Sequence, residues 1–328
     1  MGSILITGGA GFIGSNFAHF WARKNPQDEI VVLDKLTYAA NMSNLNGIEK
    51  LKVVVGDIQN FELARHLIAT YNIKTIVHFA AESHVDNSIK GPAAFIQTNL
   101  VGTFSMLEAA RQVWDGDKSC RFLHVSTDEV YGALGEDGKF SESTPYAPNS
   151  PYSASKAGSD HLVRAYFHTY GLPVLTTNCS NNYGPRQHPE KLIPLAISQI
   201  LKNEPIPIYG DGKQVRDWLY VDDHCRGIFA VIGGGKCGAT YNIGGNNEWK
   251  NIDLINLLCD EVDNVIGRVI GTSRGLITYV TDRLGHDRRY AIDATKIESE
   301  LGWKQEIGFR DGLAKTIAWY IKPNNKGQ

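Results

Sequence analysis

The sequence has few cysteines and no arrangement of them that indicates a disulfide framework or a zinc site. Five of the 328 residues are cysteine, at positions 120, 179, 225, 237 and 259, and no two form a C-x-x-C pair. The ten histidines do not lie at zinc-ligand spacing from them. An odd number of unpaired cysteines is typical of a reducing compartment, so we expect a cytoplasmic protein without a metal.

Excess charge and long apolar runs are also missing. Lys and Arg number 33 and Asp and Glu 35, which leaves a net charge of −2. A nucleic-acid partner is not expected, because clustered positive charge supplies much of the affinity for phosphate backbones. No window of about 18 apolar residues occurs. The apolar N-terminus is too short and glycine-rich for a signal peptide, so neither a membrane span nor a secretory leader is expected.

Glycine, by contrast, is abundant, with 33 residues. In the first half of the chain, short β-branched runs alternate with longer helical patterns, which predicts a parallel sheet covered on both faces. Strands are expected at 4–7, 30–33, 53–56, 75–79, 121–126 and 174–177, and helices at 12–24, 60–71, 92–113 and 151–170. After about residue 178 the loops lengthen, and short helices are expected at 192–202, 252–262 and 312–321. The predicted fold is α/β, with a Rossmann-type doubly wound parallel sheet and a smaller mixed α/β domain.

A glycine-rich segment follows the first expected strand directly. Residues 8–14, GGAGFIG, form G-x-x-G-x-x-G between a strand and a helix. Gly8 suits a tight turn, Gly11 lets the backbone approach a pyrophosphate, and Gly14 lets the helix pack on the sheet. The helix N-terminus then faces the anion with free N–H groups. The predicted dinucleotide contacts in this segment are Gly8, Gly11, Phe12, Ile13 and Gly14.

Acidic residues close the next two strands. Asp34 lies 20 residues after Gly14 (34 − 14), where a carboxylate accepts the ribose 2′-OH of NAD and repels the 2′-phosphate of NADP. A turn residue at a strand end is the alternative for Asp34, and Lys35 beside it leaves the exclusion of NADP open. Asp57 either reaches an adenine edge or only ends its strand. The other predicted cofactor contacts at strand ends are Lys35, Ile58, Ala80 and Ala81.

Tyr152 and Lys156 lie four residues apart in the segment PYSASK. This spacing puts both side chains on one face of the expected helix, and a nearby ammonium lowers the pKa of a tyrosine toward that of a usable base. Ser126 and Thr127, at the end of the fifth strand, extend this set with hydroxyl groups. A lone Y-x-x-x-K is usually an exposed pair, but the glycine motif at the same sheet edge favours a catalytic one.

Together these motifs resemble the extended short-chain dehydrogenase/reductases and, over essentially the full length, the nucleotide-sugar 4,6-dehydratases. The matching stretches are GGAGFIG, HFAAESHVD, HVSTDEVYG, PYSASKAGSD, NNYGP, EKLIP, YGDG…RDWLYVDDH and GHDRRYAID. The resemblance implies that Tyr152 removes the 4-OH proton of the sugar and that Lys156 tunes it and holds the nicotinamide ribose. It also implies a tightly bound NAD, regenerated in each turnover and contacted by Asn99.

The segment Thr127-Asp128-Glu129 favours dehydration over epimerisation. Epimerases of this family generally carry small uncharged residues after the hydroxyl residue, whereas elimination of water across C5 and C6 needs a base and an acid. Two carboxyls in different environments can divide those roles. The resemblance implies Asp128 as the acid, Glu129 as the base, and Thr127 as a contact near O4. A solvated turn after the strand is the alternative explanation of the two acids.

A nucleotide diphosphate needs cations and amide donors. The substrate contacts that the resemblance implies are Ser83, Thr127, Asn181, Lys191, Leu192, Arg216, Asn251, His286 and Tyr290. Arg216 is the first choice for the diphosphate, while His286 is also explained as a structural histidine. Arg288 and Arg289 either join this set or pair with nearby acids.

Three positions depart from the pattern of bacterial dTDP-glucose dehydratases. Those enzymes usually carry Arg where this chain has Asn87 and Asn178, and Pro where it has Leu284. None of the three touches the Thr-Asp-Glu segment or the Tyr/Lys pair. They leave the nucleotide base and the 2-substituent of the sugar open.

The expected function is therefore an NAD-dependent nucleotide-hexose 4,6-dehydratase, with dTDP-glucose as the leading substrate and UDP-glucose or UDP-N-acetylglucosamine as alternatives. A 4-epimerase and a non-catalytic NAD-binding module are weaker hypotheses. Residues 1–177, with about 217–244, are expected to bind NAD, and residues 178–216 and 245–328 to bind the nucleotide sugar. The resemblance also implies a homodimer that pairs the helices 93–113 and 152–170.

Overall fold

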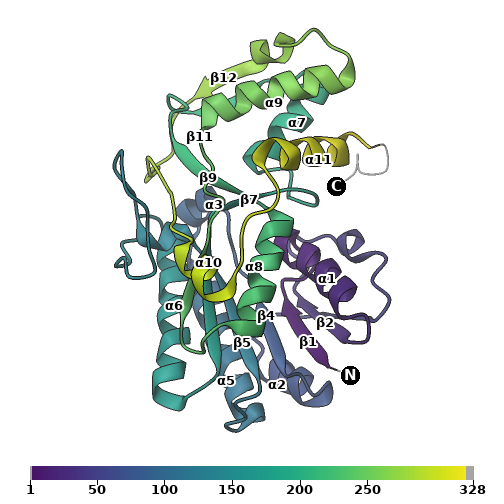
Figure 1. Ribbon diagram of the computed structural model, residues 1–328, viewed down its shortest axis with the longest axis vertical. Helices are drawn as coiled ribbons and strands as arrows, with labels where there is room; N and C mark the ends of the chain where they lie inside the picture. The colour runs from purple at the N-terminus through teal and green to yellow at the C-terminus, as the bar shows by residue number, and fades with distance from the viewer. Residues whose placement is uncertain (1, 323–328) are drawn as a thin grey trace.

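A seven-stranded sheet dominates the computed structural model, which describes residues 2–322 (Figure 1). Its strands lie in the order β10-β6-β5-β4-β1-β2-β3, and every neighbouring pair is parallel. The strands are β1 Ser3–Thr7, β2 Glu29–Asp34, β3 Leu51–Val55, β4 Thr75–His78, β5 Arg121–Thr127, β6 Val174–Cys179 and β10 Thr240–Ile243. The predicted doubly wound parallel sheet is confirmed, and β10, which the sequence pattern did not reveal, forms one edge.

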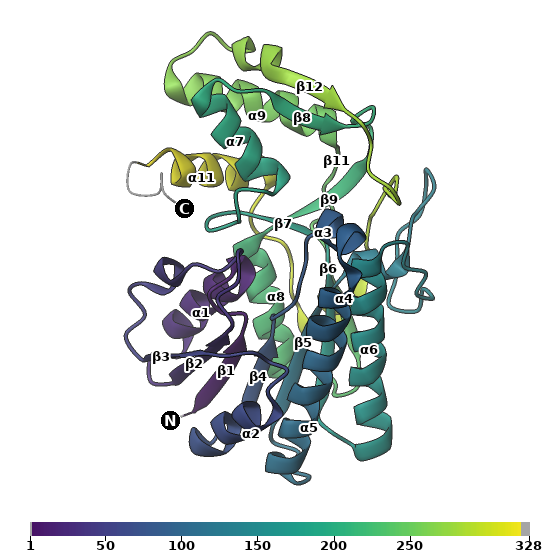
Figure 2. The same ribbon diagram turned by 180° about the vertical axis from the view of Figure 1, so that it is seen from behind.

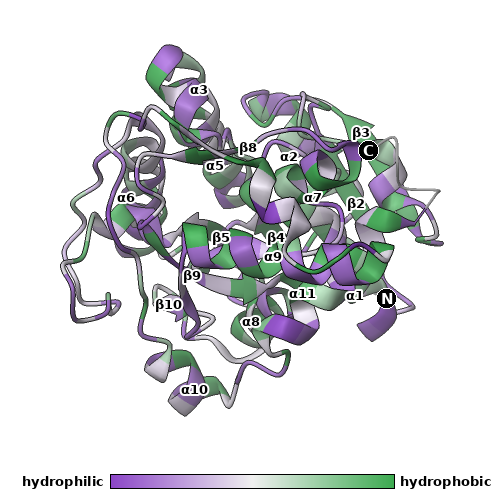
Figure 3. Ribbon diagram, turned by 90° about the horizontal axis from the view of Figure 1, so that it is seen from above, coloured by the Kyte–Doolittle hydropathy of each residue, from purple (hydrophilic) through white to green (hydrophobic). Residues whose placement is uncertain are grey.

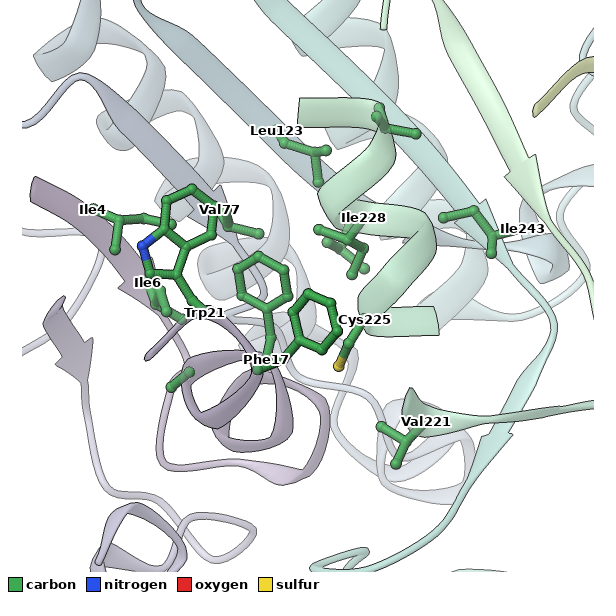
Figure 4. Packing of buried hydrophobic residues seen from close by; sticks show 14 of the residues in the cluster. Ile4, Ile6, Phe17, Trp21, Val77, Leu123, Val221, Cys225, Ile228 and Ile243 are labelled. Carbon is green, nitrogen blue, oxygen red and sulfur yellow. The ribbon is translucent and has the colours of Figure 1, made fainter. Parts of the chain in front are cut away.

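Both faces of the sheet are buried, because alternate residues of each strand pack against helices on opposite sides of the sheet. On β1, Ile4 and Ile6 join a cluster with Phe17 and Ile228, whereas Leu5 faces the opposite cluster. Figure 4 shows the first of these clusters between the sheet, α1 and α8. Continuous apolar strands of this kind require cover on both sides.

Helices supply that cover. On one side lie α1, α8 and α10, and on the other α2, α5 and α6 (Figures 1 and 2). Their bounds, with those of the shorter helices, are α1 Phe12–Lys24, η1 Met42–Leu45, α2 Phe61–Thr70, α3 Val85–Lys90, α4 Pro92–Phe95, η2 Ile96–Gly102, α5 Thr103–Trp114, η3 Asp128–Tyr131, α6 Pro151–Tyr170, α8 Val221–Gly234 and α10 Thr295–Leu301. Asn60 caps α2, since its Oδ1 accepts from the Leu63 amide at 3.0 Å.

The helix expected at 92–113 is not a uniform α-helix. It begins as α4, passes through the π-helical turn η2 and continues as α5. Asn99 in η2 is fully buried, where its side chain bonds Glu82 and Ser155. A π turn shifts the helical register locally, which lets Asn99 face these partners while α5 still packs on the sheet.

A smaller part lies beyond the carboxyl ends of the strands (Figure 1). It has a three-stranded sheet, β11-β9-β7, and a two-stranded sheet, β12-β8. Its elements are β7 Asn181–Tyr183, α7 Leu192–Lys202, β8 Ile206–Tyr209, β9 Val215–Tyr220, β11 Glu248–Lys250, α9 Asn251–Ile266, η4 Thr272–Leu276, β12 Ile277–Val280 and α11 Phe309–Ile321. Seen from above, α9 and α11 carry hydrophobic and hydrophilic residues side by side (Figure 3), and their apolar residues share one core with α7.

The chain crosses between the two parts more than once. β6 leads into β7, and α8 and β10 return to the large sheet after β9. β1 lies between β2 and β4, so the strand order reverses there, and in such sheets ligands bind outside the carboxyl ends at the reversal. None of the helices formed by residues 2–322 is long and apolar enough to cross a membrane.

Candidate active site

One continuous cleft, of about 340 Å³, opens at the carboxyl ends of β1, β2, β4 and β5. Its walls include most of the residues singled out by the sequence. The predicted residues that line it are Gly8, Gly11, Phe12, Ile13, Gly14, Asp34, Lys35, Asp57, Ile58, Ala80, Ala81, Ser83, Thr127, Asp128, Glu129, Tyr152, Lys156, Asn181 and Lys191. The predicted cofactor and catalytic residues thus share one cavity, apart from Asn99.

The glycine-rich turn admits no larger side chains at two positions. Gly8 has φ +68°, and a Cβ there would lie 2.7 Å from the Ala80 amide nitrogen. A Cβ on Gly14 would lie 2.3 Å from the Gly8 carbonyl oxygen. Gly11 caps α1 without any side-chain hydrogen bond, so the first amides of the helix face the cleft and are available to an anion.

Asp34 anchors this turn. Its carboxylate accepts from the Ala10 amide at 2.9 Å and from the Leu36 amide at 2.8 Å. Lys35 pairs with Asp57 at 2.7 Å. Burial pushes the pKa of Asp57 upward, but hydrogen bonds from Gln59 and the Lys35 ammonium outweigh it and lower the pKa overall. The Asp57 carboxylate is therefore charged, at the edge of the cleft that Asp34 also lines.

Asn99 lies behind the cleft rather than in its wall. Its side chain donates to the Glu82 carbonyl at 3.0 Å and to the Ser155 hydroxyl at 2.8 Å, and accepts from the Glu82 amide at 2.8 Å. These bonds fix the loop that follows β4. In the described structure Asn99 therefore shapes the wall and does not line it.

Tyr152 and Lys156 both lie on α6 and face the cleft as expected. Burial raises the pKa of Tyr152 well above its usual value, and Glu129 adds to this, whereas a hydrogen bond with Thr127 opposes it. Lys156 donates to the Val125 carbonyl at 2.9 Å. The lowered pKa expected for Tyr152 is therefore not found, because desolvation of the phenol dominates.

Asp128 and Glu129 begin the short helix η3 directly after β5. Burial, Glu129 and Asp217 raise the pKa of Asp128 well above its usual value, against Arg216. Burial also raises the pKa of Glu129, against three cations, Arg283, Arg216 and Lys191. The alternative of a solvated turn is excluded for Asp128, which is 1% exposed. The two carboxyls thus lie in different electrostatic surroundings, with Asp128 beside other acids and Glu129 beside cations.

Arg216 lies at the far end of this site, on β9. Its guanidinium donates to the carbonyls of Val215 and Asp287 and stacks 4.3 Å from the Tyr290 ring centroid. With two carbonyls as acceptors and five N–H donors, it retains donors for a ligand. The Tyr290 hydroxyl donates to the Asp287 carboxylate.

Among the remaining substrate candidates, His286 is influenced by the charge of Arg216. His286 lies 2.6 Å from Asp282, and burial together with Arg283 and Arg216 lowers the pKa of His286 to about 4, so the ring is neutral. Asn251 begins α9 with its Oδ1 buried and unpaired among the described residues. The candidates that do not line the cleft itself are Leu192, Arg216, Asn251, His286 and Tyr290.

The three departures lie away from the reacting groups. Asn178 is fully buried and donates to the hydroxyls of Tyr131 and Tyr146. Asn87 is exposed on α3, and Leu284 is 77% exposed on the loop after β12. None of the three lines the cleft.

Arg283 is a cation that the sequence analysis did not single out. It lies 3.8 Å from Asp86 and 5.9 Å from the Tyr209 ring centroid, and its charge acts on Glu129 and His286. Its position next to Leu284 was the available signal. Arg288 and Arg289 are paired instead with Asp211 and Glu248, the first at 3.0 Å and the second at 2.6 Å.

Comparison with known proteins agrees with this geometry. The sequence profile of GDP-mannose 4,6 dehydratase matches residues 5–316. The chain is 56% identical to a dTDP-glucose 4,6-dehydratase of Xanthomonas campestris over 98% of its length and 93% of that protein. DesIV, a dTDP-glucose 4,6-dehydratase of Streptomyces venezuelae solved with NAD bound, is 48% identical with a TM-score of 0.91, covering 99% of this chain and 98% of that one.

A more distant neighbour is the UDP-glucose 4-epimerase of Thermotoga maritima. It is 27% identical, with a TM-score of 0.86, and the match covers 97% of this chain and 98% of that one. The fold is thus shared with epimerases, while the dehydratases have the higher sequence identity to this chain. The chain belongs to the GDP-mannose 4,6 dehydratase family.

Proposed function

We propose that this protein is an NAD-dependent nucleotide-hexose 4,6-dehydratase that converts dTDP-glucose to dTDP-4-keto-6-deoxyglucose. The observation that carries the proposal is the pair Asp128 and Glu129, one buried and one half-buried carboxyl in different environments that share a cleft with Tyr152. Eight dTDP-glucose dehydratases, at 50% to 56% identity, support the substrate.

The glycine-rich turn is suited to NAD. The cradle formed by Gly8 and Gly14 has no room for a Cβ, and the free amides of α1 face the same space. Asp34 and Lys156, which both line the cleft, would bind the two riboses. When bound, NAD would supply the redox chemistry, as acceptor of a hydride from C4 of the sugar and as its donor to C6.

The side chains of the protein divide the proton transfers. Tyr152, as the tyrosinate that the Lys156 ammonium favours, accepts the proton of the 4-OH as C4 becomes a ketone, and Thr127 holds O4. The ketone acidifies the C5 proton, which Glu129 removes and gives back to C5 once C6 has been reduced. Asp128, kept protonated by burial and by the neighbouring carboxylates, gives its proton to the 6-OH as water leaves. A carboxyl buried in this way acts as a general acid near neutral pH.

The nucleotide diphosphate would extend from the sugar toward the smaller part. Lys191 and Arg216 provide cations whose charges act on Glu129, and Asn181 and Ser83 line the cleft. We therefore propose that residues 1–177, with about 217–244, hold the cofactor, and that 178–216 and 245–328 hold the nucleotide sugar, of which 323–328 lie outside the described residues. The cytoplasmic location stays a prediction.

A panel of substrates tests the proposal. The purified protein is incubated with dTDP-glucose, UDP-glucose and UDP-N-acetylglucosamine, and the alkaline absorbance of the 4-keto sugar is followed. We expect the highest kcat/KM with dTDP-glucose. A preference for either UDP-sugar would support the assigned dehydratase reaction but contradict the assigned substrate. A 4-epimer formed without a keto product would contradict the dehydratase reaction itself.

A further inference from the structure

A buried acid lies one helical turn beyond the Tyr152/Lys156 pair. Asp160 follows Lys156 by four residues on α6, so the three side chains lie along one face of the helix. Asp160 is 5% exposed and does not line the cleft. Its Oδ2 accepts from the Ser126 hydroxyl at 2.8 Å. Its Oδ1 is buried without a hydrogen bond from the described residues, although Nε2 of His124 lies 3.1 Å away.

His124 connects Asp160 to Lys156 but carries no charge. Burial and Lys156 hold the pKa of His124 well below its usual value. The Ser159 hydroxyl donates to the Lys156 carbonyl at 2.7 Å, so its oxygen accepts from Nε2 of His124 at 3.2 Å. Nε2 therefore carries the ring hydrogen, and the Lys156 ammonium, 3.5 Å away, gains no acceptor there. Its acceptor in the protein is the neutral Val125 carbonyl.

The other titratable groups around Lys156 are neutral as well. His78, on β4, is fully buried, and burial with His124 and Lys156 keeps its pKa well below the usual value. Burial raises the pKa of the Cys179 thiol on β6 and that of Tyr152. Tyr146 and His161 also act on Asp160, and each lowers its pKa. Near neutral pH, Asp160 is therefore the charged partner among these groups, since burial raises its pKa only to about 6.

We propose that Asp160 is a positioning residue that acts through Lys156: its buried carboxylate balances the Lys156 ammonium and keeps it charged beside Tyr152. This inference rests on the proposed function. An ammonium buried beside neutral groups tends to lose its proton, and an opposite charge nearby offsets that tendency. Asp160 thus supports the residue that orients the cofactor and Tyr152, without touching substrate itself.

The isosteric variant Asp160→Asn tests this role. The Cε resonance of Lys156 in lysine-labelled protein, assigned through Lys156→Met, reports its protonation without any substrate. We expect the midpoint of the Lys156 titration in Asp160→Asn to lie at least about one pH unit below that in the parent. The alkaline limb of the kcat profile should move down by the same amount, with KM unchanged within about two-fold because Asp160 lies outside the cleft.

Asp263→Asn is the matched control. Asp263 is a fully buried carboxylate on α9 that accepts from Ser273, and its loss should leave the Lys156 titration and the alkaline limb in place. An unmoved Lys156 titration in Asp160→Asn, or a rate lowered equally at every pH, would overturn the inference. An inactive parent with a shifted Lys156 titration would instead overturn only the proposed function.

A reciprocal measurement covers the case in which Asp160→Asn does not fold. In Lys156→Met the Asp160 carboxyl should titrate about one pH unit or more above its parent value of about 6, as followed by its labelled Cγ resonance. An unchanged Asp160 titration would show that the two groups are not coupled and would contradict the proposal.

Discussion

At the scale of single residues, the chemistry depends on two neighbouring carboxyls with different surroundings. Asp128 is 1% exposed and lies beside other acids, whereas Glu129 faces Arg283, Arg216 and Lys191. The sequence predicted this division of roles only through resemblance, because spacing along a chain does not state which carboxyl is buried among acids. The cation Arg283 was missed for the same reason, since it reaches Glu129 only through the fold.

Glu129→Gln should stop the reaction after oxidation at C4. The amide cannot accept the C5 proton, so formation of the 4-keto-6-deoxy product should fall roughly 10²- to 10⁴-fold, the usual contribution of a general base. Tyr152 is intact, and reduced cofactor should accumulate in a single turnover. Glu62→Gln, on the exposed face of α2, provides the control and should match the parent. Normal product from Glu129→Gln would contradict the assigned base.

Gly14→Ala should abolish retention of NAD. Its Cβ would lie 2.3 Å from the Gly8 carbonyl oxygen, so the turn and the start of α1 must separate. We expect NAD released by denaturing the purified variant to fall by at least about ten-fold, since an overpacked backbone contact costs typically 1–3 kcal/mol. Gly275→Ala, where a Cβ meets nothing within 4 Å, should retain the parent's NAD content. Equal NAD in both variants would argue against this cradle.

At the scale of elements, periodicity predicted the helices and strands of the first half. It failed where hydrogen bonds between distant residues alter the local helical geometry. The pattern over 92–113 gave no sign of the π turn η2, because that turn depends on the buried bonds of Asn99 to Glu82 and Ser155. The helix α8 and the strand β10 were also missed, although the segment 217–244 was expected to join the cofactor part. Both elements follow a glycine- and proline-rich stretch that masks the strand–helix alternation.

His224 on α8 should make the protein sensitive to acid. It is fully buried, neither ring nitrogen has a hydrogen-bond partner among the described residues, and burial lowers its pKa to about 3. The unfolded chain binds a proton near pH 6.5, so the unfolding free energy falls as the pH drops from about 6.5 toward 3. Between pH 7 and pH 5 the unfolding free energy of the parent should fall by about 2 kcal/mol through His224. His224→Leu should remove this part of the decrease.

Chemical denaturation at the two pH values measures this loss. His66→Leu, at an exposed position of α2, is the control and should keep the parent's dependence on pH. The same acid sensitivity in His224→Leu as in the parent would show that His224 is not held neutral in the folded protein.

At the scale of the whole molecule, a nearly neutral chain brings three of its cations together around one carboxylate. The net charge is −2, yet Lys191, Arg216 and Arg283 all act on Glu129. This local cluster is suited to a single diphosphate, whereas an extended polyanion would need a basic surface. The composition alone argued against an extended polyanion as ligand. It did not locate a diphosphate site, since the three cations come from separate segments of the chain.

The outer face of η2, α5 and α6 should pair two copies of the chain. Exposed apolar side chains gather there, with Ile96 at 42%, Phe104 at 47% and Tyr170 at 54%, and contiguous patches of this kind mark interfaces. Light scattering should find the parent at twice its chain mass of 36.2 kDa and Phe104→Glu as a monomer. Tyr279→Glu, on β12 in the smaller part and 58% exposed, should remain dimeric. Phe104→Glu should disrupt the dimer because buried aromatic side chains carry much of the binding energy of such interfaces. A monomeric parent would contradict the proposed interface.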